Sequence, residues 1–136
     1  MARDAQSVIG VEIIPEAVED AKFNAKNNNI ENARFFCGDA SALAAELAKE
    51  NTKADVVILD PPRKGLTEEL IKTVANDFSP ERVVYVSCDS GTLARDIKIF
   101  SDLGYRLIEY TPCDLFPRTI HCETVCLLCR NTVSAI

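Results

Sequence analysis

The sequence Ala54-Asp-Val-Val-Ile-Leu-Asp60 decides the fold class of this 136-residue chain. Its apolar residues run on without polar alternation, as they do in a parallel strand that is covered by helices on both faces. Asp60 opens the segment Asp60-Pro-Pro-Arg-Lys-Gly65, and two successive prolines can continue neither a strand nor a helix. We therefore predict a central strand over Ala54–Leu59 that ends in a rigid loop at the carboxyl edge of a parallel sheet.

Strand-like and helix-like segments alternate on both sides of this stretch. The other predicted strands are Ser7–Ile14, Ala33–Cys37, Val83–Val86, Tyr105–Tyr110 and Thr124–Leu128, and helical patterns begin at Pro15, Ala40, Thr67 and Thr92. Such alternation predicts an α/β fold, a doubly wound and mostly parallel sheet with helices on both faces. The last two strands are joined only by a loop from Thr111 to about Ile120, which is too short for a parallel crossover, so we expect a terminal antiparallel strand pair.

Composition limits the classes of protein to which the chain can belong. Apolar residues make up 47% of it, enough for a hydrophobic core, and no stretch approaches the roughly 20 apolar residues of a membrane span. The amino terminus has no apolar signal core, so we predict a cytoplasmic protein. Fifteen basic and 21 acidic residues give a net charge of −6, and this argues against a general electrostatic grip on nucleic acid by this segment alone.

The six cysteines are expected to be reduced thiols in that compartment. Three of them, Cys122, Cys126 and Cys129, have the C-x3-C-x2-C spacing that can hold an iron–sulfur cluster. The segment between them is an apolar strand run without glycine, and a strand directs Cys129 to the face opposite Cys122 and Cys126. We therefore predict no metal site, and a redox or metal-binding function, including zinc at His121, is the weakest alternative.

Cys88 is the most informative single residue. It ends the apolar run Val83–Val86 and precedes a helical pattern, so it is expected at the ligand-binding edge of the sheet. A thiol near a helix amino terminus is a better nucleophile, because the helix dipole favours the thiolate. The alternative is a small apolar residue that closes a strand.

Four acidic residues are expected at the same edge. Glu12 ends the first strand, where an acid can accept hydrogen bonds from ribose hydroxyls, and Asp39 follows Cys37-Gly38 and can bind an adenine amino group or cap the next helix. Asp60 opens the proline loop, and Glu123 begins the last strand, whose antiparallel direction returns its start to this edge. Each of these acids also has a purely structural alternative as a cap, a turn or a strand end.

A thiol beside a carboxylate suits the methylation of uracil. Carbon 5 of uracil becomes nucleophilic when a thiolate adds to carbon 6, and a base must afterwards remove the proton from carbon 5. Cys88 is the candidate nucleophile and Glu123 the candidate base.

The chain resembles the catalytic domain of the S-adenosylmethionine-dependent RNA uracil-5-methyltransferases, which make 5-methyluridine in ribosomal and transfer RNA. The segments that carry the resemblance are Ile9–Glu12, Gly38-Asp39, Asp60–Gly65, Val86–Asp96 and Phe116–Glu123. It implies a Rossmann-like class I methyltransferase fold, S-adenosylmethionine as cofactor and RNA, ribosomal or transfer, as substrate. The target base would be unstacked to reach the site.

The resemblance also implies a role for each candidate. Cys88 would be the nucleophile and Glu123 the base, Glu12 would hold the cofactor ribose, Asp39 the adenine end, and Asp60 would lie between cofactor and uracil. Arg63 or Arg95 would contact RNA phosphate.

The chain departs from this family in one respect. Family members carry a strand and a glycine-rich loop before the Gly-Val-Glu strand, and only about six residues precede Val8 here. We therefore predict that residues 1–136 are a partial catalytic domain, a carboxyl-terminal fragment of a larger enzyme. The missing strand would leave the edges of Ser7–Ile14 and Ala54–Leu59 unpaired, and a homodimer could cover them. The alternatives are an N-methyltransferase that uses the Asp60-Pro-Pro loop and a folded, non-catalytic assembly module.

Overall fold

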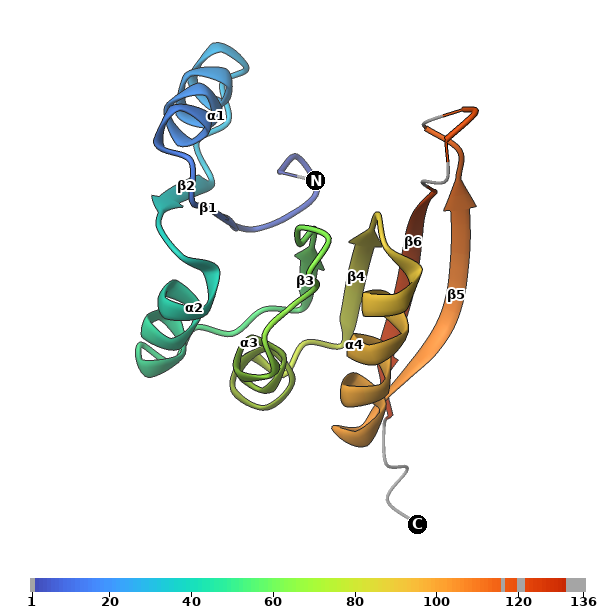
Figure 1. Ribbon diagram of the computed structural model, residues 1–136. Coiled ribbons are helices and arrows are strands. Elements are labelled where there is room, and N and C mark those ends of the chain that lie inside the picture. Colours follow the sequence, from blue (N-terminus) through green and yellow to red (C-terminus); the bar gives the residue numbers. More distant parts are fainter. Residues whose placement is uncertain (1, 116, 120–121, 132–136) are drawn as a thin grey trace. The chain divides into compact units, whose positions relative to one another are not determined.

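The computed structural model describes residues 2–115, 117–119 and 122–131 (Figure 1). The chain divides into two compact units, Met1–Leu47 and Ala48–Ile136, each of which is described by itself. His121, considered above only as part of a zinc site, lies outside the described residues. Within those residues, no helix combines the length and the apolar character that crossing a lipid bilayer requires.

The first unit is built on a βαβ arrangement. Strand β1 (Val8–Glu12) and strand β2 (Ala33–Cys37) are parallel and are joined by helix α1 (Pro15–Asn27), and helix α2 (Ala40–Lys49) begins in this unit. Pro15 occupies the first turn of α1, where its missing N–H costs nothing. Gly10 is required in β1, because a Cβ there would lie 2.8 Å from the ring of Phe35 on β2. The ends of α1 and β2 confirm the sequence prediction.

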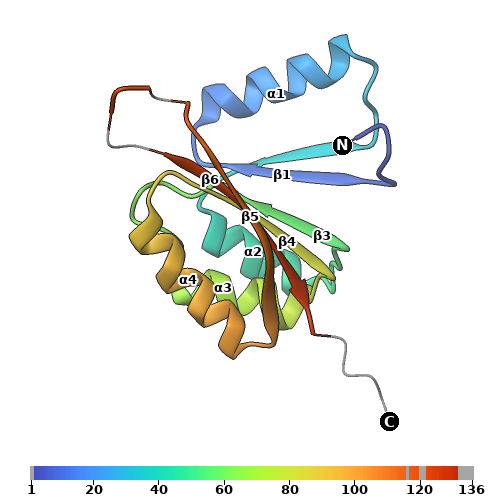
Figure 2. The same ribbon diagram turned by 90° about the vertical axis from the view of Figure 1, so that its right-hand side faces the viewer.

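The second unit contains a mixed sheet. Its elements are β3 (Val56–Leu59), α3 (Glu68–Lys72), the π-helix η1 (Thr73–Phe78), β4 (Arg82–Ser87), α4 (Ser90–Asp102), β5 (Tyr105–Cys113) and β6 (Glu123–Arg130). The strand order is β3-β4-β6-β5, with β3 and β4 parallel and β6 antiparallel to both of its neighbours (Figure 2). The predicted α/β class and the terminal antiparallel pair are confirmed, while the insertion of β6 between β4 and β5 was not predicted.

The core of the second unit lies between this sheet and its helices. Alternate residues of β4, Val83, Tyr85 and Ser87, are buried. Helix α4 contributes Phe100, whose ring meets that of Tyr105 edge-on at 5.7 Å between centroids. The Tyr105 hydroxyl donates a hydrogen bond to the Pro80 carbonyl, so this buried polar group is satisfied.

Three local features differ from the sequence prediction. Helix α4 begins at Ser90 rather than Thr92, because the Asp89 carboxylate accepts a hydrogen bond from the Thr92 N–H and caps the helix. The helix that starts after the Thr67 cap continues as the π-helix η1 and stops at Ser79, which adopts a left-handed conformation before Pro80. Strand β5 extends to Cys113 and carries an irregularity at Ile108.

Strands β1 and β3 each have a single partner among the described residues. Strand β1 pairs with β2 alone, and β3 pairs with β4 alone. On β3, Val56 and Ile58 are 41% and 46% exposed, although both are large apolar residues. The predicted open edges are therefore present on Ser7–Ile14 and Ala54–Leu59.

Candidate active site

The pairing of β4 with β6 leaves Cys88 and Glu123 at the same end of two neighbouring strands. The last residue of β4, Ser87, is opposite Thr124, and the strands are antiparallel. The same register carried one position further sets Cys88 opposite Glu123. Both residues are half-buried, so they lie at the edge of the sheet with access to solvent. The convergence of the Cys88 thiol and the Glu123 carboxylate on one substrate stays a prediction.

Asp60 lies at the same edge. It directly follows β3, which is parallel to β4 with Leu59 opposite Tyr85. The carboxyl ends of the two parallel strands therefore meet at one edge, and the Asp60 side chain is exposed there. The second unit thus presents Asp60, Cys88 and Glu123 from three adjacent strands.

The turn that carries Cys88 is held by its neighbours. The Ser87 hydroxyl donates to the Asp89 carbonyl at 2.9 Å and accepts from the Asp89 N–H at 3.2 Å. The Asp89 carboxylate caps α4, and its hydrogen bonds from Thr92 lower the pKa of this carboxyl. Cys88 therefore lies one residue before the cap of a helix whose amino terminus favours an anionic group.

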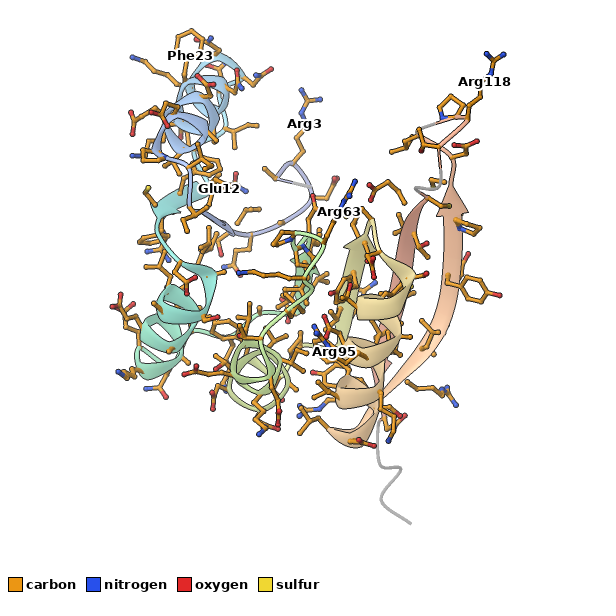
Figure 3. The ribbon with its side chains drawn as sticks, in the orientation of Figure 1. Arg3, Glu12, Phe23, Arg63, Arg95 and Arg118 are labelled. Atoms are coloured by element: carbon orange, nitrogen blue, oxygen red, sulfur yellow. The ribbon has the colours of Figure 1, made fainter. Side chains whose placement is uncertain are left out.

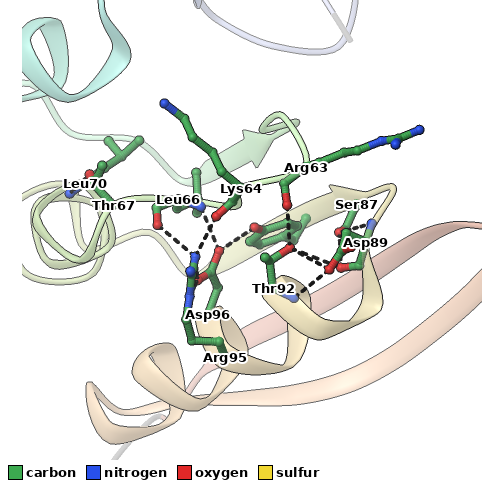
Figure 4. Close-up of polar contacts among 11 residues, drawn as sticks. Arg63, Lys64, Leu66, Thr67, Leu70, Ser87, Asp89, Thr92, Arg95 and Asp96 are labelled. Carbon is green, nitrogen blue, oxygen red and sulfur yellow. Dashed lines mark hydrogen bonds and ion pairs between the residues drawn. The ribbon is translucent and has the colours of Figure 1, made fainter.

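The proline loop is held by hydrogen bonds to α4 (Figure 4). The Arg95 guanidinium donates to the carbonyls of Lys64 and Leu66 at 3.0 and 3.1 Å and forms an ion pair with Asp96 at 2.7 Å. Asp96 in turn accepts from the Leu66 N–H at 2.8 Å. The expectation that Arg95 contacts RNA phosphate is not supported by this geometry, since its guanidinium faces loop carbonyls. Arg63, the other candidate, extends away from α4 (Figure 4).

Asp96 and Tyr85 are the buried polar residues that sequence reasoning missed. Asp96 is 0% exposed, and the Tyr85 hydroxyl donates to its carboxylate at 2.6 Å. Burial, and then the neighbouring carboxylate, raise the pKa of Tyr85, so that it remains a donor. A signal for this pair is present in the sequence. Asp96 falls between Leu93 and Phe100 on the apolar stripe of its helix, where a charged residue needs partners.

The first unit presents two exposed acids at the carboxyl edge of its strands (Figure 3 labels Glu12). Glu12 ends β1, and its carboxylate accepts from the Ile14 N–H at 2.9 Å. Asp39 follows β2, and its carboxylate accepts from the N–H groups of Ser41 and Ala42 at 2.9 and 3.1 Å. The capping role expected as one alternative for Asp39 is therefore present. Because an ionised carboxylate offers about four acceptor sites, the cap leaves capacity for a ligand.

The cysteines of β6 are arranged as a strand dictates. Cys126 is buried and Cys129 is half-buried, and burial raises the pKa of the Cys126 thiol. Within the described ranges there is no group of three or more cysteine, histidine or acidic side chains that could hold a metal ion.

The chain shares its Rossmann-like α/β fold with several solved proteins, methyltransferases among them. The fibrillarin pre-rRNA processing protein of Methanococcus jannaschii has the same fold, with a TM-score of 0.70 at 18% identity over 91% of this chain and 56% of that one. A precorrin-6y C5,15-methyltransferase from Geobacter metallireducens has a TM-score of 0.66 at 16% identity, covering 91% of this chain and 66% of that one.

The chain belongs to the tRNA (uracil-5-)-methyltransferase family, whose model matches residues 1–131. It is 49% identical over 130 residues to an uncharacterized RNA methyltransferase of Bacillus cereus and 50% identical over 130 residues to one of Enterococcus faecalis. These matches cover 96% of the chain but 28% of either relative, so the chain spans little more than a quarter of their length.

Proposed function

We propose that the chain works as part of an enzyme that transfers a methyl group from S-adenosylmethionine to carbon 5 of a uridine in RNA. The observation that supports the proposal most is the register of β4 and β6, whose last pair, Ser87 and Thr124, leaves Cys88 and Glu123 at the same end of the two strands. Membership of the family supports the substrate class. The RNA is proposed to be ribosomal, with transfer RNA as the alternative.

Cys88 acts as the nucleophile in this proposal. Its thiolate forms a bond to carbon 6 of the uracil, and the electron pair of the carbon 5–carbon 6 double bond moves into an enolate. Carbon 5 is then nucleophilic enough to accept the electrophilic methyl group that S-adenosylmethionine supplies when bound. Cys88 is half-buried and directly precedes Asp89, the cap residue of α4, at the carboxyl end of β4.

Glu123 acts as the base that completes the reaction. Its carboxylate takes the proton from the methylated carbon 5. The electron pair of that C–H bond restores the double bond, the bond from carbon 6 to sulfur breaks, and Cys88 leaves as a thiolate. The position of Glu123 opposite Cys88 supports this role, because nucleophile and base must reach adjacent carbons of one ring.

Glu12, Asp39 and Asp60 are the proposed cofactor-binding residues. Glu12 is an exposed carboxylate at a strand end, which fits the two hydroxyls of a ribose. Asp39, also exposed, fits the amino group at the adenine end, and Asp60 is proposed to lie between cofactor and uracil.

We propose that most of the affinity for RNA comes from other parts of a longer protein that contains this chain. The net charge of −6 gives this segment little general affinity for phosphate, and its relatives are more than three times as long. We propose that residues 1–136 are a partial catalytic domain of such an enzyme. The homodimer that could cover the edges of β1 and β3, and the cytoplasmic location, stay predictions; a solution mass of one chain would contradict the dimer.

Exchange of the hydrogen at carbon 5 tests the nucleophile without a methyl donor. Addition of a thiolate lets carbon 5 take up a solvent proton, and reversal releases either hydrogen, so the full-length protein should release tritium from RNA containing [5-³H]uridine. Cys88→Ala should abolish this release, and Cys122→Ala, which removes an exposed thiol next to Glu123, should retain it. Methyl transfer by Cys88→Ala would contradict the proposal and favour an N-methyltransferase that uses the Asp60-Pro-Pro loop.

Calorimetric titration with S-adenosylhomocysteine tests the cofactor residues. Binding should be lost in Glu12→Ala and kept in Glu16→Ala, which removes an exposed acid from the first turn of α1. Equal affinity in both variants would remove Glu12 from the proposed site.

A further inference from the structure

A fully buried carboxylate lies next to the candidate active site, and the proposed reaction does not use it. Asp96 of α4 is 0% exposed and accepts hydrogen bonds from the Tyr85 hydroxyl and the Leu66 N–H. An isolated buried charge costs several kcal/mol, on the order of the whole stability of a small domain, unless it is paired and hydrogen-bonded. Here the buried carboxylate is paired with Arg95 and accepts two hydrogen bonds, so its partners show what it holds in place.

What Asp96 holds is the loop that begins with Asp60. Three residues of α4 reach this loop: Thr92, Arg95 and Asp96, here called the α4 clamp. The Thr92 hydroxyl donates to the Arg63 carbonyl at 3.1 Å, and the Arg95 guanidinium donates to the carbonyls of Lys64 and Leu66. With the bond from the Leu66 N–H to Asp96, the clamp binds backbone groups of Arg63, Lys64 and Leu66 (Figure 4).

Gly65 shows how closely the loop is seated on the clamp. Its φ of +73° is a conformation that favours glycine. A Cβ there would lie 2.6 Å from the Arg95 guanidinium and 2.7 Å from the Asp96 carboxylate. The loop can therefore approach α4 this closely only without a side chain at position 65.

The clamp also reaches the turn that carries the nucleophile. Thr92 donates its N–H to the Asp89 carboxylate at 2.9 Å, and its hydroxyl lies 3.2 Å from the same group. Asp89 directly follows Cys88 and is bound to Ser87 on its other side. Thr92 is thus a shared partner of the Asp60 loop and the Cys88 turn.

We propose that the α4 clamp is a set of positioning residues that fixes the Asp60 loop relative to Cys88. Two successive prolines, Pro61 and Pro62, leave little backbone freedom between Asp60 and the held residues, so the clamp sets the position of Asp60 as well. Reacting groups need placement to a fraction of an ångström, and a misplacement of about 1 Å can cost about 100-fold in rate. The inference rests on the proposed function, in which Asp60 and Cys88 act on one uracil.

Thr92 offers a matched pair of variants. Thr92→Val keeps the shape and removes the hydroxyl, whereas Thr92→Ser keeps the hydroxyl. In the tritium-release assay, Thr92→Val should lower kcat by about 10- to 100-fold with the KM for RNA within about twofold, and Thr92→Ser should recover most of the rate. Equal rates for the two variants would overturn the proposal.

Arg95→Lys separates positioning from contact with RNA. A lysine keeps the charge but cannot donate to two carbonyls and Asp96 with one planar fork. The clamp predicts a loss in kcat with little change in KM, and a rise in KM with unchanged kcat would instead assign Arg95 to RNA phosphate. Lys98→Ala on the same helix, whose partner Asp102 is exposed, is the control and should leave both constants unchanged.

Amide hydrogen exchange of the loop provides a readout that needs no activity. In Thr92→Val and Arg95→Lys, the amides of residues 63–66 should exchange at least about 10-fold faster, while β4 and β6 stay protected. Unchanged exchange of the loop overturns the clamp even if the enzyme is active. Absence of tritium release by the unaltered protein would instead overturn the proposed function, and the catalytic purpose of the clamp with it, whatever the loop exchange shows.

Discussion

The strand ends of the two units are organised in different ways. In the first unit, the carboxylates of Glu12 and Asp39 bind backbone N–H groups two or three residues ahead of them. In the second unit, the loop after β3 is held by side chains that lie 29 to 31 positions away in the sequence. Under the proposed function, local bonds suffice to present an acid to a ligand hydroxyl, whereas the proposed nucleophile and its neighbours need contacts between several elements. The contribution of these contacts to the free energy of unfolding can be measured.

Loss of Asp96 should have the largest effect. Asp96→Ala leaves the buried Tyr85 hydroxyl and the Leu66 N–H without their acceptor, and we expect the free energy of unfolding to fall by about 3 kcal/mol. Urea unfolding followed by circular dichroism measures this change. Asp102→Ala, which breaks an exposed ion pair on the same helix, should cost about 0.5 kcal/mol or less. Equal losses in the two variants would mean that the contacts of Asp96 between elements do not stabilise the second unit.

The thiols extend the comparison between the units. Cys37 at the end of β2 is exposed, whereas Cys126 in β6 is buried and its pKa is raised by that burial. A higher pKa means less thiolate at pH 8, so Cys126 should react with iodoacetamide at least about 10-fold more slowly than Cys37. Peptide mass spectrometry after timed alkylation gives both rates in one sample. Similar rates would show that β6 opens readily in solution.

Asp39 separates a local cap from a ligand contact. Asp39→Ala should lower the free energy of unfolding by about 1 kcal/mol, because the N–H groups of Ser41 and Ala42 lose their acceptor. Asp39→Ser keeps a capping oxygen and should restore most of that stability. If Asp39 also binds the adenine end of the cofactor, calorimetry should find weak binding of S-adenosylhomocysteine to both variants. Normal binding by the serine variant would leave Asp39 with the cap alone.

The smallest expected effect concerns the charge on Asp89. Hydrogen bonds from Thr92 lower the pKa of this carboxyl in the folded state. Its contribution is therefore fully present above the unfolded pKa of about 3.9 and is lost as the pH falls through the lower folded value. The urea midpoint should fall more steeply below about pH 4 in the unaltered protein than in Asp89→Asn. The other acids are the same in both proteins, so the difference between the two curves reports Asp89. If the urea midpoints of the two proteins change with pH in parallel, Asp89 makes no such contribution.

The sequence predicts local features of this molecule better than distant ones. Pro15 marks the start of α1, and the unbroken apolar run before Asp60 marks β3, because each signal is contained in a few adjacent residues. The start of α4 was placed two residues late, because the cap at Asp89 depends on a side-chain rotamer.

In the candidate site, too, some features follow from local sequence and others depend on distant contacts. Cys88 and Glu123 could be placed at one edge from strand directions alone. The position of β6 between β4 and β5, and the partners of Asp96, depend on which strands and helices meet across the core. For the same reason, the sequence shows the charge of Arg95 but not the carbonyls of Lys64 and Leu66 that it faces.

The strand order β3-β4-β6-β5 has a consequence for folding during synthesis. A ribosome makes β4 and β5 before β6, yet β6 lies between them in the finished sheet. Until residues 123–130 have emerged, β4 and β5 each keep an inner edge that invites pairing with other chains. A nascent chain in this state already carries Cys88, and it acquires Glu123 only with the strand that closes the sheet.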